Sequence, residues 1–275
     1  MSEAARVQAV IAAGLTRPEL ITRWMADPGE LDRHGLAGRD LDLAAIAKFA
    51  GLGMKVRHNG LRAVLPCSFR LLKRARIEIE LFAAYARHVS SGGAPLGATN
   101  LERARGLAGF FETWRDVRDP LHGLIGDSLQ NEIAVLELRS APPVPEEGAA
   151  PLGRGSVVAS SILGVRGRLL LRELRFAPQV IAAASVDADD APLPEAPAET
   201  HLLGYWQAPA CEDVELLELD ALGWAVLTRL DGARSLDEVA HAVTGRPATD
   251  VFLGLVSPLV ELGMASARRP GQPSP

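Results

Sequence analysis

The sequence predicts an α+β protein, with a helical bundle in its N-terminal half and strands followed by short helices in its C-terminal half. Up to about Arg139, Ala, Leu, Arg and Glu dominate and β-branched residues are sparse, which favours helix. After residue 156, short runs of alternating or β-branched character indicate strands. We therefore expect a helical domain over residues 1–140, a linker rich in Pro and Gly over residues 141–155, and a second domain over residues 156–275.

Four features place helices in the first half. A short apolar helix is expected over Leu41–Phe49, ended by Gly51 and Gly53. Ser68 offers a cap for a helix that runs through Tyr85, and Asn100 offers a cap for the next one. Pro120 suits the first turn of a further helix, whose apolar residues recur every three to four positions. These helices predict one antiparallel bundle.

The middle of the chain changes from linker to strand. Residues 156–165 and 168–176 are expected to be strands joined by a turn bounded by glycine. A short helix is expected after Pro178. Residues 186–199 are acidic and rich in proline, and this composition is typical of irregular segments.

The C-terminal part predicts two strands, over residues 201–206 and 214–219, and then three helices. Asp231-Gly232 is a helix-end signal, Ser235–Glu238 reads as a capping box, and Pro258 should kink or divide the last helix. This order is a winged-helix-like arrangement. The three expected helices are Asp220–Leu230, Ser235–Val243 and Thr249–Gly263.

Charge and hydropathy argue against two broad classes. The net charge is −5, whereas general nucleic-acid binders usually carry a basic excess. No apolar run approaches the roughly 18–20 residues of a spanning helix, and the N-terminus lacks the features of a secretory signal. We therefore expect a cytoplasmic protein that binds neither nucleic acid nor membrane.

The sequence contains no recognisable catalytic motif or metal-ligand set. Cys67 and Cys211 are the only cysteines, and no histidine lies three to five residues from another. Phosphate-binding loops, dinucleotide fingerprints and nucleophile elbows are also missing from the sequence. We expect Cys67 to be a packed side chain, Cys211 to be a poor nucleophile beside two carboxylates, and His122 to pair with Asp119. We name no catalytic residue, cofactor or metal ligand.

The C-terminal motifs resemble a known family. A short strand ends at Leu219-Asp220, an apolar helix follows, and Asp231–Val239 reads D-G-x-x-[ST]-L-x-E-[IV]. The segment closes with Val260–Met264. This pattern resembles the PqqD-like recognition elements of RiPPs, the ribosomally synthesised and post-translationally modified peptides. The resemblance implies a small domain that captures the leader segment of a precursor peptide.

The first half is similar to a second group of proteins. Lys55–Arg87 and the D-x-L-x-x-E pattern within Asp127–Arg139 resemble the helical part of companion subunits of multinuclear non-haem iron oxygenases. Leu169–Val186 resembles the insert that joins the two parts of these companions. Methanobactin and thiaglutamate-type peptide pathways use such subunits. The resemblance implies a non-catalytic companion that forms a heterodimer with the oxygenase, which carries the iron.

The strand at 214–219 is the expected edge to which a leader peptide adds, with one face of the last helix as the wall of the groove. Phe252 and Leu262 are expected to turn into the core. The alternative is that the strand and the helix face are ordinary core. The expected leader-binding residues are Val214, Leu216, Leu217, Leu219, Val251, Leu255 and Leu259.

A basic cluster in the first half is the expected docking surface for the oxygenase. The alternative is a solvated polar turn with one buried hydrogen-bonding Asn. The expected docking residues are Lys55, Arg57, His58, Asn59 and Arg62, and more basic residues follow at Arg70, Lys73, Arg74 and Arg76.

Two other functions remain open from the sequence. A transcription regulator would use the last helix to read DNA, but Thr249–Gly263 contains no Lys or Arg to meet phosphates. A stand-alone enzyme of another type is the third possibility.

The ligand spacing generates the first testable prediction. Because the sequence offers no histidine pair, cysteine pair or carboxylate–histidine helix motif, the purified protein should carry no stoichiometric iron or zinc. Elemental analysis measures this directly. About one tightly bound metal ion per chain would contradict it.

Overall fold

The chain mixes helices with antiparallel sheet, as the sequence predicts at the level of fold class. It divides into two compact units, residues 1–129 with 179–194 and residues 130–178 with 195–275. The division falls inside one long helix, whereas the sequence analysis places it at residue 140. Most of the expected linker and of the acidic segment at 186–199 lies outside the described residues. The computed structural model describes residues 3–16, 18–33, 41–92, 97–145, 157–186, 192, 194–195 and 200–268.

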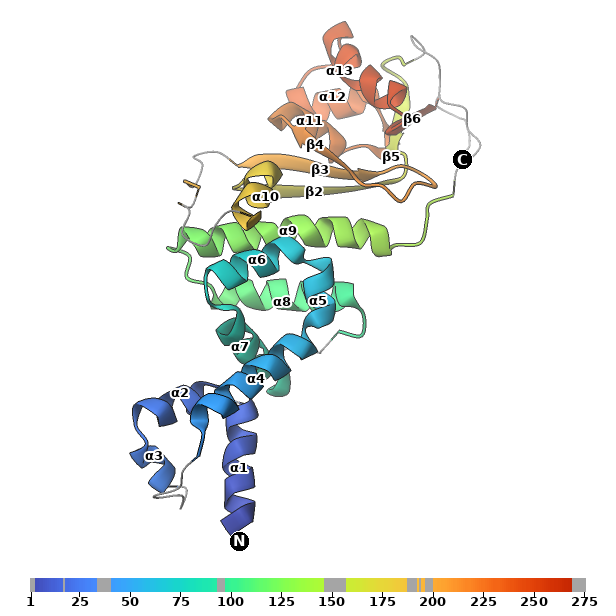
Figure 1. Ribbon diagram of the computed structural model, residues 1–275. Helices are drawn as coiled ribbons and strands as arrows, with labels where there is room; N and C mark the ends of the chain where they lie inside the picture. Colours follow the sequence, from blue (N-terminus) through green and yellow to red (C-terminus); the bar gives the residue numbers. More distant parts are fainter. Residues whose placement is uncertain are drawn as a thin grey trace. The chain divides into compact units, whose positions relative to one another are not determined.

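The first unit is built from helices (Figure 1). Helix α9 (Pro120–Ser140) belongs to it as far as residue 129. A short later helix, α10 (Pro178–Val186), returns to the first unit, where its Ala184 carbonyl accepts a hydrogen bond from Arg74 at 3.0 Å. The other helices are α1 (Glu3–Thr16), α2 (Pro18–Ala26), α3 (Gly29–Asp32), α4 (Leu43–Arg57), α5 (Asn59–Val64), α6 (Pro66–Arg74), α7 (Glu78–Ser90) and α8 (Asn100–Trp114).

Two predicted helix boundaries are wrong in this unit. Helix α4 continues through Gly51 to Arg57, because it packs against α1, α2 and α7 and those contacts outweigh the roughly 1 kcal/mol helix penalty of a glycine. Helix α8 is capped by Thr99 rather than Asn100. Thr99 and Glu102 form a full capping box. The Glu102 carboxylate accepts backbone hydrogen bonds, and these lower its pKa.

The single helix expected from Ser68 to Tyr85 is two helices, α6 and α7. The chain turns between them at Arg76, whose φ is +58°. Ser68 caps neither helix, since Pro66 begins α6 and the Ser68 hydroxyl is buried, donating to the Ser128 hydroxyl at 3.0 Å. The turn lets both helices contribute to the core, through Leu72 and Tyr85 among others.

In its described residues, the second unit contains two three-stranded antiparallel sheets, three complete helices and the part of α9 after residue 129. One sheet has the order β2-β3-β4 and the other the order β5-β1-β6. The strands are β1 (Ile162–Val165), β2 (Arg168–Leu174), β3 (His201–Gln207), β4 (Glu215–Leu219), β5 (Asp231–Ser235) and β6 (Ala265–Arg268), and the helices are α11 (Ala221–Leu227), α12 (Leu236–Thr244) and α13 (Asp250–Glu261).

Strands β1 and β2 are adjacent in the chain but belong to different sheets. Gly167, with φ +76°, makes the turn between them, and a side chain there would overlap the Gln207 carbonyl oxygen. The main chain of Arg166 forms two hydrogen bonds. Its backbone N–H donates to the Met264 carbonyl at 2.8 Å, and its carbonyl accepts from the Trp206 indole at 2.7 Å.

The sheet β2-β3-β4 is covered on both faces. On one face, Tyr205 donates to the Asn131 side chain at 2.7 Å and Arg172 pairs with Glu137 at 3.5 Å, so residues 130–140 of α9 lie against it. On the other face, Leu171 and Leu219 pack against the core of the three helices. The alternation of side chains along each strand produces this arrangement.

The structure tests three predictions for the C-terminal helices. The capping box of Ser235 and Glu238 is confirmed at the start of α12. Asp231-Gly232 does not simply end a helix, because it opens strand β5, which pairs with β1. Pro258 does not divide α13, since Leu262 still donates to the Pro258 carbonyl at 2.8 Å and the helix is continuous from residue 250 to 261.

The packing around Tyr85 generates a prediction. A Cβ at Gly106 would lie 2.6 Å from the Tyr85 hydroxyl, which is buried without a hydrogen-bond partner among the described residues. Overpacking costs about 1–3 kcal/mol, against a gain of about 1 kcal/mol in helix propensity. Gly106→Ala should therefore lower the free energy of unfolding, measured by chemical denaturation.

Gly109 on the same helix is the control, because a Cβ there meets nothing within 4 Å. Gly109→Ala should stabilise the protein by up to about 1 kcal/mol. In a Tyr85→Phe background, where the obstructing oxygen is gone, Gly106→Ala should behave like Gly109→Ala. An equal loss in both backgrounds would contradict this packing.

Candidate functional site

Strand β4 lies at the edge of its sheet. It pairs with β3 alone, from Glu215 opposite Trp206 to Leu219 opposite Leu202. No strand in the described part of the chain pairs with its outer side. An edge strand directs every second residue's N–H and C=O outward, so β4 can accept another extended chain.

The two faces of β4 differ in their surroundings. Leu217 lies opposite Gly204, and Leu219 on the same face approaches the Gly204 Cβ position to 3.5 Å and packs against the helical core. Leu216 and Glu218 point to the other face and are exposed. The missing side chain at Gly204 leaves room for these leucines.

Helices α11 and α13 stand beside the end of β4. Asp220 follows the strand directly and caps α11, because its Oδ1 accepts a hydrogen bond from the Gly223 backbone N–H at 2.6 Å. Thr249 caps α13 in the same way through the Phe252 N–H at 3.4 Å. The caps fix where each helix begins and therefore where its apolar face lies.

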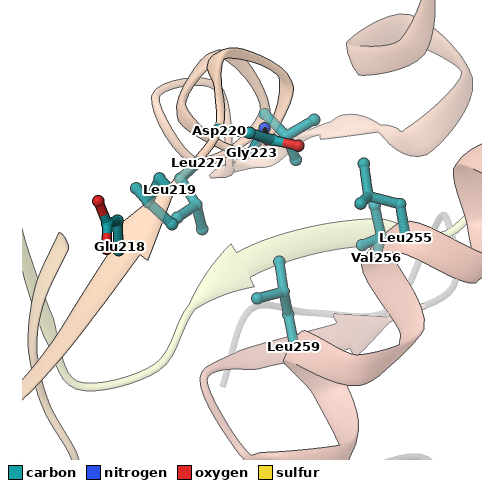
Figure 2. A pocket seen from close by; sticks show the side chains of 9 residues that line it. Glu218, Leu219, Asp220, Gly223, Leu227, Leu255, Val256 and Leu259 are labelled. Carbon is teal, nitrogen blue, oxygen red and sulfur yellow. Dashed lines mark hydrogen bonds between the residues drawn. The ribbon is translucent and has the colours of Figure 1, made fainter. Parts of the chain in front are cut away.

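An apolar groove of about 390 Å³ lies between the end of β4, α11 and α13 (Figure 2). In the close-up, Leu255 and Leu259 on α13 face across the groove toward Leu219 and α11. A volume of this size is at the lower end of the range for small-molecule sites and admits a few side chains of a peptide. Its lining residues are Glu218, Leu219, Asp220, Gly223, Val226, Leu227, Leu255, Val256 and Leu259.

Three of the residues predicted to bind a leader, Leu219, Leu255 and Leu259, line this groove together. Leu217 is half-buried on the same face of β4 as Leu219. The structure therefore brings the predicted strand and the predicted helix to one cavity.

Leu217 and the other three predicted leader-binding residues lie outside the lining. Val214 precedes β4 and is half-buried, and Leu216 is 41% exposed on the opposite face of the strand. Val251 is 85% exposed at the start of α13. Phe252 is buried, which confirms its predicted place in the core, whereas the same prediction for Leu262 is wrong, because Leu262 is 67% exposed at the end of the helix.

The sequence analysis missed the contribution of α11. Val226 and Leu227 line the groove, and Asp220 and Gly223 form its rim. Their helical spacing was a usable signal for an apolar face, but nothing in the pattern indicates that this face meets α13.

Some of the predicted docking residues pack against other side chains, and others lie on the surface. Lys55 and Arg57 are on α4, and their side chains lie outside what the structure describes. Asn59 is exposed at the start of α5. His58 stacks on Phe82 with ring centroids 4.1 Å apart.

Arg62 is partly withdrawn from solvent. It forms an ion pair with the buried Glu78, and its guanidinium lies 4.9 Å from the centre of the Phe69 ring. Arg74 is bonded to the Ala184 carbonyl, as described above. By contrast, Arg70, Lys73 and Arg76 are exposed on and just after α6.

The remaining candidate groups have ordinary environments. His122 Nδ1 accepts from the Asp116 N–H at 3.0 Å, and its Nε2 is 3.8 Å from Asp119. Cys67 and Cys211 form no disulfide in the described part of the chain, and each is partly buried. Within the described ranges, no group of three or more His, Cys, Asp or Glu side chains is placed to hold a metal ion. No helix in those ranges is both long enough and apolar enough to cross a membrane.

Comparison with known proteins does not assign the chain to a family. No family model matches it, and no curated protein matches it.

Proposed function

We propose that this chain is a non-catalytic companion subunit in RiPP biosynthesis. It binds the leader of a precursor peptide between the outer edge of β4 and α13, and it presents the peptide to a multinuclear non-haem iron oxygenase. The observation that carries this proposal is the free edge of β4 beside an apolar groove. The iron resides on the oxygenase, and this chain supplies binding.

An edge strand and a groove together suit an extended peptide. Main-chain hydrogen bonds to β4 supply affinity that does not depend on sequence, and side chains at alternate positions of the peptide enter the groove. The apolar lining of Leu219, Leu255 and Leu259 provides a water-excluding contact for them. None of these steps requires a reactive side chain.

The order of elements supports a winged-helix-like domain. Helix α11, strand β5, helices α12 and α13 and strand β6 follow one another, and β1 fills the centre of their sheet. In a transcription regulator of this type, α13 would face DNA. Asp250 and Glu261 are its only charged residues, and they repel phosphates, which favours a peptide ligand.

The proposed surface for the oxygenase is the exposed basic group of the first unit. Arg70, Lys73 and Arg76 are exposed, and no ion pair to them occurs among the described residues. In a chain with a net charge of −5, such a group offers a local site for an acidic partner surface.

The edge of β4 generates a prediction about proline. Neighbouring residues in a strand direct their N–H groups to opposite sides, so one of Leu216 and Leu217 donates toward β3 and the other outward. Proline at the outward position should leave the fold intact and lower leader affinity, whereas proline at the inward position should also destabilise the sheet. Leu216→Ala and Leu217→Ala are the controls and should have smaller effects, because they keep the main chain.

The measurement combines calorimetry, with a synthetic candidate leader peptide, and circular dichroism. Two folded proline variants that both bind like the wild type would remove β4 from the site. Preferential binding of duplex DNA over the peptide would favour the regulator.

The wall of the groove generates a second prediction. Leu255→Asp should weaken leader binding by tenfold or more, because an unpaired carboxylate at a buried contact costs several kcal/mol. Leu262→Asp is the control on the same helix, since Leu262 is exposed and outside the lining. Equal effects of the two changes on affinity would contradict a specific role for the groove.

The basic group generates a third prediction. Reversing its charge with Arg70→Glu and Lys73→Glu should reduce co-purification with a co-expressed oxygenase and increase the dependence on ionic strength of what remains. Arg118→Glu is the control, because Arg118 is exposed elsewhere in the first unit. Full recovery of the oxygenase with the double variant would refute this docking surface while leaving leader binding untouched.

A further inference from the structure

The two segments that form the groove carry charge of one sign. Residues 209–228 and 247–267 contain no Lys or Arg, whereas arginines occur elsewhere in the second unit, as at Arg168 and Arg172 on β2. A groove bordered by one sign of charge and lined by apolar groups concentrates its field on an incoming ligand. The acidic residues of the two segments are Glu212, Asp213, Glu215, Glu218, Asp220, Asp250 and Glu261.

The alternation along β4 assigns these charges to positions of a bound strand. A residue paired with Glu218 across the outer edge shares the face of Glu218, with Cβ atoms about 4.5–5.5 Å apart. Residues paired with Leu217 and Leu219 lie on the other face, from which Leu219 packs against the helical core and lines the groove. This holds for a parallel or an antiparallel peptide, since side chains alternate in both.

Glu218 is available for such a pair. Its side chain is 66% exposed, and its Oε1 lies 2.8 Å from the Nδ1 of His201 on the same face of the sheet. Glu215 is also exposed, at the start of β4. A peptide carboxylate opposite Glu218 would be repelled, and an ammonium or guanidinium would be attracted.

We propose that the groove selects a leader segment in which a Lys or Arg stands between two apolar residues, with the cation opposite Glu218 and the apolar side chains opposite Leu217 and Leu219. A second cation is favoured opposite Glu215. This inference rests on the proposed function and adds the chemistry of the peptide that the site takes. The carboxylates supply selectivity and the main chain and groove supply most of the affinity.

A charge on an edge strand also prevents pairing with other copies of the same protein. That role needs a charge of either sign at position 218, so Glu218→Lys would preserve it. Selection of a peptide charge needs a carboxylate at this position. The two roles are therefore separated by reversing the charge.

The experiment is a selection of random displayed peptides on the full-length chain, on Glu218→Lys and on the control Glu173→Lys. Glu173 is an exposed carboxylate on β2, at the far edge of the same sheet. The wild type and Glu173→Lys should enrich Lys or Arg between two apolar residues, and Glu218→Lys should enrich Asp or Glu there. Fluorescence anisotropy then measures one selected peptide and its Lys→Glu variant against each protein.

We expect the Lys→Glu peptide to bind the wild type roughly threefold to tenfold more weakly, and to recover affinity on Glu218→Lys. Peptides that depend on Leu255 but are indifferent to charge at their centre would overturn this inference and keep the proposed function. Failure to enrich any peptide whose binding is lost with Leu255→Asp would overturn both.

Discussion

The two hydrogen bonds of the Arg166 main chain hold the two sheets of the second unit together. Its N–H is bonded to Met264, which directly precedes β6, and its carbonyl is bonded to Trp206 on β3. Because Gly167 then turns the chain within one residue, β1 and β2 leave this point into different sheets. The position of α13, which ends just before Met264, is therefore set relative to the sheet that contains β4.

The same arrangement explains why the edge of β4 stays open. Both faces of β2-β3-β4 are occupied, one by residues 130–140 of α9 and one by the helical core. Strand β1 lies between β5 and β6 and does not join this sheet. The outer main chain of β4, like that of β2 at the other edge, is left without a partner among the described strands, and the apolar groove lies beside β4. Its neighbouring groove is apolar because Leu255 and Leu259 share one face of α13 with the core residue Val256 beside them.

The sequence predicted the parts whose signals are local. The strands at 201–207 and 215–219, the capping box at Ser235 and the helix after Pro178 follow from patterns of neighbouring residues. Strands β5 and β6 were not predicted, because both are short. Strand β5 coincides with a turn signal and β6 follows the end of a helix, so only pairing with β1 makes them strands. His58 and Arg62, expected as a polar surface, make ring contacts with Phe82 and Phe69 that depend on the tertiary fold.

A site built on main-chain groups leaves a weak trace in the sequence. The atoms of β4 that would bind a peptide are N–H and C=O groups that every strand possesses, so residue types alone cannot mark them. The discriminating feature is that an edge covered by no described strand lies beside an apolar groove, which is a property of topology and packing. The side chains add only two constraints that a sequence can express, namely Leu217 and Leu219 on one face and the carboxylate of Glu218 between them on the other. Because those two constraints alternate along a single strand, a bound peptide must alternate in the complementary sense, and its specificity is a pattern of residue types rather than one required residue.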